Sequence, residues 1–294
     1  MRLVSQFTVA FMKVLITGAA GLIGSHAARR LSGEHQVVAL KHPDLDISDR
    51  ESVDCVISDA QPSLVINGVV IQVDESEQNS ARAYAVNVEG PRNLAEAAHR
   101  VGAEFVHFST QYAFDGEPVG RAPYTIEDQP RPINLYGKTK VASERAALDA
   151  CPRSYIIRTS WVYGSGKESF LCTAHRDLRA GKRICAIADI WSSTTYVEDL
   201  IERILQILER RRYGIYHVVN EGVCSYYEFA LEAGRLVGLS REGADSLIEV
   251  LQEAEMKRVA ARPRYTPMRC LVSAELGLPS MRSWQSALAA YVQS

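Results

Sequence analysis

The chain has 294 residues, of which 47% are hydrophobic, and its formal net charge at pH 7 is −2. This length and composition allow one large domain, or two unequal ones, with a well-filled core. The nearly balanced charge excludes the broad basic surface of proteins that bind polymeric nucleic acid, and no apolar run reaches the roughly 18 residues that a membrane span needs.

Cysteine and histidine usage argues against disulfides and metal ligands. The six cysteines are scattered without a C-x-x-C pair, and the seven histidines form no metal-ligating pattern. We therefore expect reduced thiols, no metal and a cytoplasmic protein. We interpret residues 1–11 as an N-terminal extension, because Met12 stands directly before the first predicted strand and the segment lacks the cleavage site of a signal peptide.

Short apolar segments alternate with amphipathic ones along the first part of the chain. The expected strands are 13–17, 35–40, 63–68 and 104–110, and the expected helices are 22–33, 50–60 and 84–102. Strands that alternate with helices imply right-handed crossovers. The sequence therefore predicts an α/β fold with a Rossmann-type, doubly wound parallel sheet.

The second part of the chain continues this pattern and then turns mostly helical. Helices are expected at 138–150, 170–180 and 197–211, strands at 154–164, 183–189 and 214–220, and a loop at 262–265. From Ser225 onward the chain is expected to be mainly helical. We predict a dinucleotide-binding domain over residues 1–160 and a mainly substrate-binding, smaller portion over residues 161–294, interleaved with the same sheet.

Three glycines, Gly18, Gly21 and Gly24, lie between the first strand and the first helix in "TGAAGLIG". Residues without a Cβ let the backbone approach a pyrophosphate, which the free N–H groups of the helix N-terminus would bind. The spacing is G-x-x-G-x-x-G and differs from the general dinucleotide fingerprint. Tight packing of the strand on the helix is therefore the alternative interpretation.

Residues at the end of the second predicted strand should decide whether NADPH or NADH binds. Lys41 and His42 favour the 2′-phosphate of NADPH, whereas Asp44 or Asp46 just beyond could bind the adenosine ribose or adenine. The sequence predicts NADPH, with NADH as the alternative.

The stretch "PINLYGKTK" places Tyr136 and Lys140 four residues apart, on one face of a helix. A nearby ammonium would lower the tyrosine pKa from about 10 and would make the phenol a proton donor to a carbonyl that receives a hydride. Ser109 and Thr110 end a parallel strand, at the edge where such sheets bind ligands. A turn of surface helix and a simple strand cap are the alternative interpretations.

These motifs, together with "HFSTQYAFDG", "IIRTSWVYG" and "RPRYTPMRCLVSAELGLP", resemble the dTDP-4-dehydrorhamnose reductase family of the extended short-chain dehydrogenase/reductase superfamily over most of the chain. The resemblance implies NADPH-dependent reduction of the 4-keto group of a nucleotide-linked deoxysugar. It implies a catalytic set of Thr110, Tyr136 and Lys140, with Tyr136 as proton donor. The cofactor contacts expected in addition to Tyr136 and Lys140 are Gly18, Gly21, Leu22, Ile23, Gly24, Lys41, Asp46, Ile47, Asn67, Gly68 and Ser109, and the substrate contacts are Gln111, Trp161 and Arg262.

The chain departs from the family pattern near the expected substrate. Ile71 in "NGVVIQ" stands where a tyrosine is usual, Gln111 replaces a carboxylate, and "WSSTTY" replaces a glycine-proline turn. We therefore predict retained reductase chemistry on a somewhat different sugar or related carbonyl, with a nucleotide sugar and a second copy of the chain as candidate partners. The alternatives are an epimerase or dehydratase that retains NAD, and a non-catalytic regulatory subunit that binds dinucleotide.

Overall fold

The computed structural model describes residues 11–294, so the extension expected over residues 1–11 lies, except for Phe11, outside the described residues. Six strands form one parallel sheet in the order β10-β5-β4-β3-β1-β2. Their bounds are β1 Lys13–Thr17, β2 Gln36–Leu40, β3 Leu64–Asn67, β4 Glu104–Thr110, β5 Ser154–Thr159 and β10 Gly214–His217.

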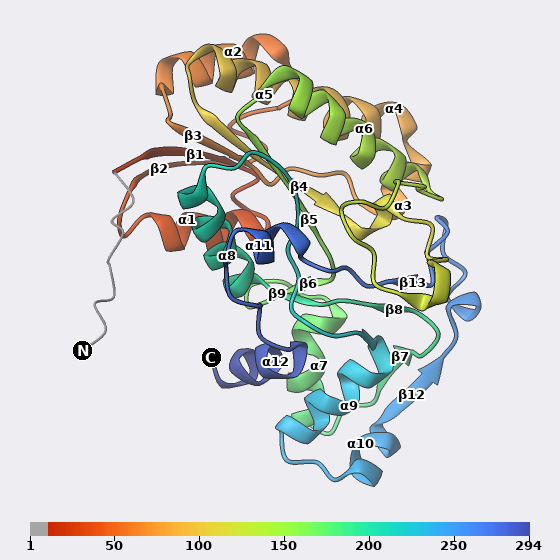
Figure 1. Ribbon diagram of the computed structural model, residues 1–294. Coiled ribbons are helices and arrows are strands. Elements are labelled where there is room, and N and C mark those ends of the chain that lie inside the picture. The colour runs from red at the N-terminus through yellow and green to blue at the C-terminus, as the bar shows by residue number, and fades with distance from the viewer. Residues whose placement is uncertain (1–10) are drawn as a thin grey trace.

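Helices cover both faces of this sheet, as Figure 1 shows. One face carries α2 (Arg50–Ala60), α5 (Gly90–Arg100) and α6 (Leu135–Ala150), and the other carries α1 (Leu22–Leu31), α8 (Val197–Arg210) and α11 (Leu271–Glu275). Successive residues of β1 point to opposite faces of the sheet. Val14 and Ile16 pack in the core between the sheet and α8, and Leu15 packs in the core between the sheet and α5. The expected α/β class with a doubly wound parallel sheet is confirmed.

The remaining elements form the lower lobe of Figure 1 and the edge of the site. Phe229, Tyr163 and Trp284 are buried at the centre of the lobe's own apolar core. Its helices are α7 Phe170–Arg179, α9 Tyr226–Leu236, α10 Arg241–Leu247 and α12 Trp284–Gln293; its strands are β6 Val162–Tyr163, β7 Ile184–Ile187, β8 Trp191–Ser192, β9 Thr195–Tyr196, β11 Cys224–Ser225, β12 Ile248–Leu251 and β13 Tyr265–Thr266. Because β10 lies in the main sheet although it follows residue 160, both parts of the chain contribute to that sheet, and the functional division at residue 160 stays a prediction.

Several boundaries differ from those expected. The strand expected at 154–164 is two strands, because Trp161 adopts a left-handed backbone (φ 40°) that turns the chain out of the main sheet toward β9. The strand expected at 183–189 is β7, which pairs with β12 rather than with the main sheet. Tyr265 and Trp191, both expected in loops, pair in a small sheet as parts of β13 and β8.

The long helix expected at 84–102 is also interrupted. It consists of the end of α4 (Ser80–Tyr84), a π-helical turn at Ala85–Glu89 and then α5; a short helix α3 (Val73–Gln78) comes before it. The π turn directs Asn87 back to the chain after β3, where its amide accepts from the Ile71 N–H (2.7 Å) and donates to the Ile71 carbonyl (3.1 Å). The interruption thus serves to hold the segment that follows β3.

Candidate functional site

A cavity of about 690 Å³ opens at the carboxyl ends of β1, β3, β4 and β5, where parallel sheets bind ligands. Most of the predicted site residues line it, although they come from distant parts of the chain. They are Gly18, Gly21, Leu22, Ile23, Asp46, Ile47, Asn67, Gly68, Thr110, Gln111, Tyr136, Lys140 and Trp161.

The glycine turn forms one end of this cleft. Gly18 has φ +70°, and a Cβ there would lie 2.6 Å from the carbonyl carbon of Gly68, so no side chain fits. Helix α1 then begins after Gly21 with no side-chain cap. No side chain therefore accepts hydrogen bonds from the first N–H groups of α1. Such a helix N-terminus at the cleft suits a phosphate.

Gly24 has a packing role instead. It lies outside the lining of the cleft, and a Cβ at this position would come within 2.4 Å of the Gly18 carbonyl oxygen. Gly24 therefore lets α1 approach β1 closely, as the packing interpretation of the motif required.

The end of β2 presents different residues from those expected. His42 and Asp46 line the cleft, whereas the exposed Lys41 does not, and its backbone N–H donates to Asp44 Oδ2 at 2.7 Å. Asp46 accepts from the hydroxyl and the N–H of Ser48 (2.7 and 2.9 Å), and these two hydrogen bonds lower the pKa of its carboxyl group. An ionised Asp46 is thus oriented toward the same end of the cleft.

Thr110, Tyr136 and Lys140 meet at the centre of the cleft. Asn134 caps α6 by accepting from the Gly137 N–H at 2.8 Å, which places Tyr136 in the first turn, and Thr110 ends β4. Burial raises the pKa of Tyr136 to about 12, and hydrogen bonding to Thr110 opposes that rise. Burial lowers the pKa of Lys140 to about 7.

Burial thus opposes, in this structure, the lowering of the tyrosine pKa that was expected from Lys140. The phenolate would lose its hydration in the buried cleft, and burial also lowers the charge of Lys140, which is only partly protonated near pH 7. The lysine nitrogen contacts His107 Nε2 at 3.0 Å. The protonated phenol is consequently the stable form of Tyr136.

Ser109 points away from the cleft, because successive residues of a strand face opposite sides. Its hydroxyl donates to Glu144, which also forms an ion pair with Arg158 at 2.6 Å. Both charged side chains are 3% exposed. Ser109 therefore belongs to a buried polar network beneath α6.

Two aromatic rings and an arginine form the side of the cleft toward the lower lobe. Trp161 stacks on Tyr226 with ring centroids 3.9 Å apart. Arg262 lines a small adjoining cavity, where it pairs with Asp74 Oδ2 at 2.7 Å and its guanidinium lies 6.0 Å from the Tyr112 ring centroid. The expected substrate residues thus lie together, with the Arg262 charge already paired.

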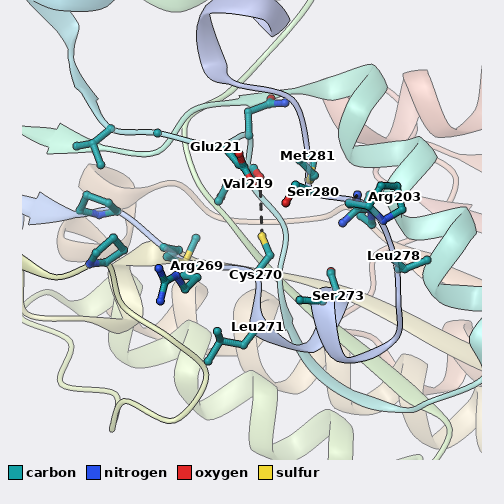
Figure 2. Close-up of a pocket in the computed structure, with 18 residues that line it drawn as sticks. Arg203, Val219, Glu221, Arg269, Cys270, Leu271, Ser273, Leu278, Ser280 and Met281 are labelled. Carbon is teal, nitrogen blue, oxygen red and sulfur yellow. Dashed lines mark hydrogen bonds between the residues drawn. The ribbon is translucent and has the colours of Figure 1, made fainter.

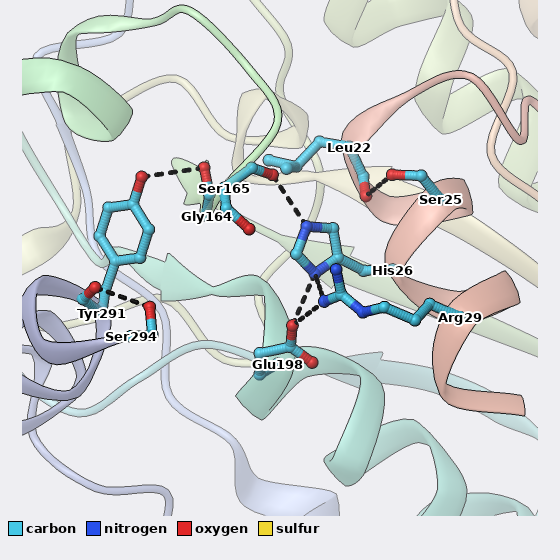
Figure 3. Close-up of polar contacts among 9 residues, drawn as sticks. All are labelled: Leu22, Ser25, His26, Arg29, Gly164, Ser165, Glu198, Tyr291 and Ser294. Carbon is cyan, nitrogen blue, oxygen red and sulfur yellow. Dashed lines mark hydrogen bonds and ion pairs between the residues drawn. The ribbon is translucent and has the colours of Figure 1, made fainter. Parts of the chain in front are cut away.

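In the loop 164–169 the sequence points to Ser169, which stands where asparagine is common in the family, but sequence reasoning missed Lys167; both residues line the cleft. Figure 3 shows how this loop is fastened to α1 and α8. His26 Nε2 lies 2.9 Å from the Ser165 carbonyl oxygen and His26 Nδ1 lies 2.7 Å from Glu198 Oε1, while Tyr291 donates to the Gly164 carbonyl (3.1 Å). The "GSGKES" composition was the available signal, since a glycine-rich loop after a parallel strand lies at the ligand-binding edge.

A second cavity, of about 530 Å³, lies between the chain after β10 and the segment 267–281 (Figure 2). Arg203, which is 5% exposed, and Cys270, which contacts the Val219 carbonyl at 3.8 Å, are among its lining residues. None of the predicted site residues lines this cavity. The chemistry predicted from the sequence therefore belongs to the first cleft and the small cavity that adjoins it.

Two absences apply to residues 11–294. No group of three or more histidine, cysteine, aspartate or glutamate residues in this range is arranged to hold a metal ion. No helix within it has both the length and the apolar character required to cross a membrane.

Comparison with known proteins agrees with this geometry. A family model described as the RmlD substrate binding domain matches residues 12–294. A dTDP-4-dehydrorhamnose reductase of Mycolicibacterium smegmatis is 37% identical, over 97% of this chain and 86% of the relative. A solved dTDP-4-dehydrorhamnose reductase of Bacillus anthracis, in complex with NADP, superposes with a TM-score of 0.89 at 31% identity, over 97% of this chain and 100% of that one.

The fold itself extends to more distant proteins. A UDP-glucose 4-epimerase of Thermus thermophilus, solved as a complex with NAD, superposes with a TM-score of 0.79 at 22% identity, over 96% of this chain and 98% of that one. The expected class, an NAD(P)H-dependent sugar-nucleotide ketoreductase, agrees with the closer relatives above. The chain belongs to the RmlD substrate binding domain family, within the extended short-chain dehydrogenase/reductase superfamily, as the motifs indicated.

Proposed function

We propose that the protein is an NADPH-dependent reductase of the 4-keto group of a dTDP-linked 6-deoxysugar, with dTDP-4-dehydrorhamnose as the first substrate to test. The observation that carries this proposal is the meeting of Thr110, Tyr136 and Lys140 in one cleft with the glycine turn. The named activity of relatives over 30% identical supports the choice of substrate, and the NADP complex of one of them supports the coenzyme.

The residues of the cleft fit a dinucleotide. The uncapped N-terminus of α1 and the cradle at Gly18, which a Cβ would fill, suit the pyrophosphate, and His42 lies at the end of β2 where a 2′-phosphate would be accommodated. When bound, NADPH supplies a hydride to the carbonyl carbon. We place Asp46, Ile47, Asn67 and Gly68 along the same path.

The proton for the carbonyl oxygen would come from Tyr136. Its hydroxyl is protonated at neutral pH, because burial raises its pKa to about 12. Thr110, at the end of β4, would turn its hydroxyl from Gln111 Oε1 to the same oxygen, donate a second hydrogen bond to it and align it. The charge that develops on the oxygen is thus neutralised as the C–H bond forms.

The substrate would enter between Trp161 and Arg262. The stacked rings of Trp161 and Tyr226 offer an apolar face, and Arg262 could exchange its Asp74 partner for a diphosphate. Gln111 accepts from the Thr110 hydroxyl at 3.0 Å and so stands beside the reacting oxygen.

The homodimer and the cytoplasmic location stay predictions.

The test is an assay of purified protein that follows NADPH absorbance with dTDP-4-dehydrorhamnose, with NADH in a parallel arm. Tyr136→Phe removes the donated proton and should lower kcat by about 10²- to 10⁴-fold. Tyr213→Phe is the matched control, because its hydroxyl contacts Glu104 at 3.1 Å, at the start of β4 and away from the cleft.

Unchanged turnover in Tyr136→Phe would exclude the tyrosine as proton donor. Recovery of tightly bound NAD, with no net consumption of NADPH, would indicate an epimerase or dehydratase instead. Absence of turnover across a sugar-nucleotide panel, with a co-purifying enzyme, would indicate a regulatory subunit.

A further inference from the structure

The second cavity, between the chain after β10 and the segment 267–281, shares no lining residue with the cleft that holds Tyr136 and Lys140. Its volume of about 530 Å³ lies within the range of small-molecule sites. Leu278 and Met281 are among several apolar residues that line it, and its charged residues are two arginines and one glutamate. A ligand that fits this lining combines an apolar body with a charged group.

Arg203, on α8, is the buried cation of this cavity. It is 5% exposed, and its two hydrogen bonds go to neutral groups, from Nε to Gln206 Oε1 at 2.9 Å and from Nη2 to the Pro279 carbonyl. Its Nη1 atom has no hydrogen-bond partner in the part of the chain that the structure describes. Because a guanidinium carries five N–H donors in a planar fork, donors remain for a ligand in the cavity that Arg203 lines.

The charge of this guanidinium is not neutralised by the protein. No carboxylate of residues 11–294 forms an ion pair with Arg203, and Asp199, one turn earlier on α8, is paired with Arg282 at 2.6 Å. Glu221 also lines the cavity, and Figure 2 shows it across the cavity from Arg203. Burial lowers the pKa of Arg203, but a guanidinium keeps its proton at neutral pH. Since buried charges are normally paired, the cavity offers this cation to an anion.

A second, independent observation is the hydroxyl group of Ser273 on α11 (Leu271–Glu275). Ser273 is 3% exposed and lines the same cavity, and its Oγ atom is buried without a hydrogen-bond partner among the described residues. A buried hydroxyl that lacks a partner destabilises the protein, so such groups point to a partner that binds from outside. Figure 2 shows Ser273 and Arg203 at the same cavity, and a hydroxyl and a guanidinium both donate to an oxyanion.

We propose that this cavity binds a small organic anion, whose carboxylate or phosphate group pairs with Arg203 and accepts a hydrogen bond from Ser273. The planar fork of an arginine matches two oxygens of either group. Leu278 and Met281 then pack against the apolar part of the ligand. Arg269, the other arginine of the lining, adds to the positive charge, so arginines outnumber carboxylates there. The site is separate from the first cleft and does not depend on the proposed reductase activity.

The first test locates a probe, para-iodobenzoate, which joins a carboxylate to an apolar ring and an anomalous scatterer. Crystals of the protein soaked in it should show an iodine peak in this cavity, with the carboxylate on the Arg203 guanidinium. Para-iodophenyl phosphate is the parallel arm for a phosphate group. Para-iodobenzyl alcohol has the same ring without the charge and should give no peak there.

An empty cavity with both anions overturns the proposal, and a peak in the first cleft alone counts as an empty cavity. A peak of equal height with the alcohol overturns it as well, because the cavity would then bind the ring and not the charge. These results need no variant to fold.

The second test measures affinity in solution, by isothermal titration calorimetry with the anion that the crystals bind. Arg203→Gln should weaken binding by about tenfold or more, because it removes the charge and the fork. Arg210→Gln is the matched control, since Arg210 is an exposed arginine of the same helix outside the lining, and it should leave the affinity unchanged.

Ser273→Ala removes a hydroxyl group that no described group binds, so it should not lower the free energy of unfolding. It should nevertheless weaken binding of the anion by about threefold or more, which a purely structural role of Ser273 would not produce. Full affinity in either Arg203→Gln or Ser273→Ala overturns the proposal. Neither test depends on turnover, so the failure of this site and the failure of the reductase proposal are distinguishable.

Discussion

Arg158 and Glu144 form an ion pair with each side chain only 3% exposed, on the same polar network as Ser109. Two hydrogen bonds join them, at 2.8 and 2.6 Å, and the Arg158 guanidinium also lies 5.4 Å from the Phe114 ring centroid. Removing one member leaves a charge in the core without its counterion, which costs far more than breaking an exposed pair. The pair therefore holds β5 against the helix that carries Tyr136 and Lys140.

Glu144→Gln should lower the free energy of unfolding by about 3–5 kcal/mol, because Arg158 then remains buried and cationic. Urea denaturation measures the change. Glu168→Gln is the control, since Glu168 pairs with Arg176 on the surface, and it should leave the denaturation midpoint unchanged. A midpoint for Glu144→Gln equal to that of the control would show that the buried pair contributes little.

At this scale the sequence predicted which residues gather but not how each one acts. The four-residue spacing of Tyr136 and Lys140 is a property of any helix, so their common face was predictable. Their pKa values were not, because these depend on burial, on Thr110 of β4 in the case of Tyr136 and on Glu144 in the case of Lys140. Lys41 and Ser109 were assigned by position, and the structure turns both away from the cleft.

At the scale of elements, the turn from β1 into α1 sets how closely the helix approaches the sheet. The Gly21 N–H donates to the Gly18 carbonyl at 2.9 Å, and the same carbonyl blocks any Cβ at Gly24. Backbone contacts within the turn therefore help to place the N-terminus of α1. A single methyl group should displace it.

Gly24→Ala should weaken NADPH binding by about tenfold or more, because a Cβ only 2.4 Å from the Gly18 carbonyl oxygen pushes the helix N-terminus away from the pyrophosphate. Fluorescence titration with NADPH measures the dissociation constant. Gly33→Ala is the matched control: no atom lies within 4 Å of its Cβ position, so affinity should stay the same. Equal affinities for the two variants would contradict the close-approach argument.

Helices and strands whose own sequence has a clear hydrophobic periodicity were predicted well. Short strands that are defined by their pairing with distant segments were not. The bounds of β1, α2 and β4 agree with those expected, because alternation and helical spacing are visible within each segment. The break at Trp161 and the strands β12 and β13 were missed. Their pairing partners lie far away in the chain, and short strands carry little periodicity of their own.

At the scale of the whole molecule, a buried histidine links global stability to pH. His217 at the end of β10 is 1% exposed, packs edge-on against Phe114 and lies 3.3 Å from the Tyr124 carbonyl. Burial lowers its pKa from 6.5 to about 3. As the pH falls below 6.5 the unfolded chain takes up this proton and the folded protein does not, so folding loses stability down to about pH 3.

His217→Asn keeps an N–H donor toward the Tyr124 carbonyl and removes the titration. Between pH 7 and pH 5 the unsubstituted protein should lose about 2 kcal/mol more of its unfolding free energy than the variant does. Urea denaturation at the two pH values gives this difference, with the substitution of an exposed histidine, His99→Asn, as control. Equal losses in all three proteins would show that His217 does not govern the acid sensitivity.

The sequence by itself determined the parallel α/β class, the glycine turn and the Tyr136–Lys140 pair, because each depends on backbone conformation or spacing within a few residues. Only the tertiary structure decided that His107 faces Lys140, that Glu144 engages Ser109 and that residues 164–169 border the cleft. These contacts join segments tens to more than a hundred residues apart. Their geometry follows from how the layers pack, and packing sets the burial that in turn sets the protonation of Tyr136 and Lys140.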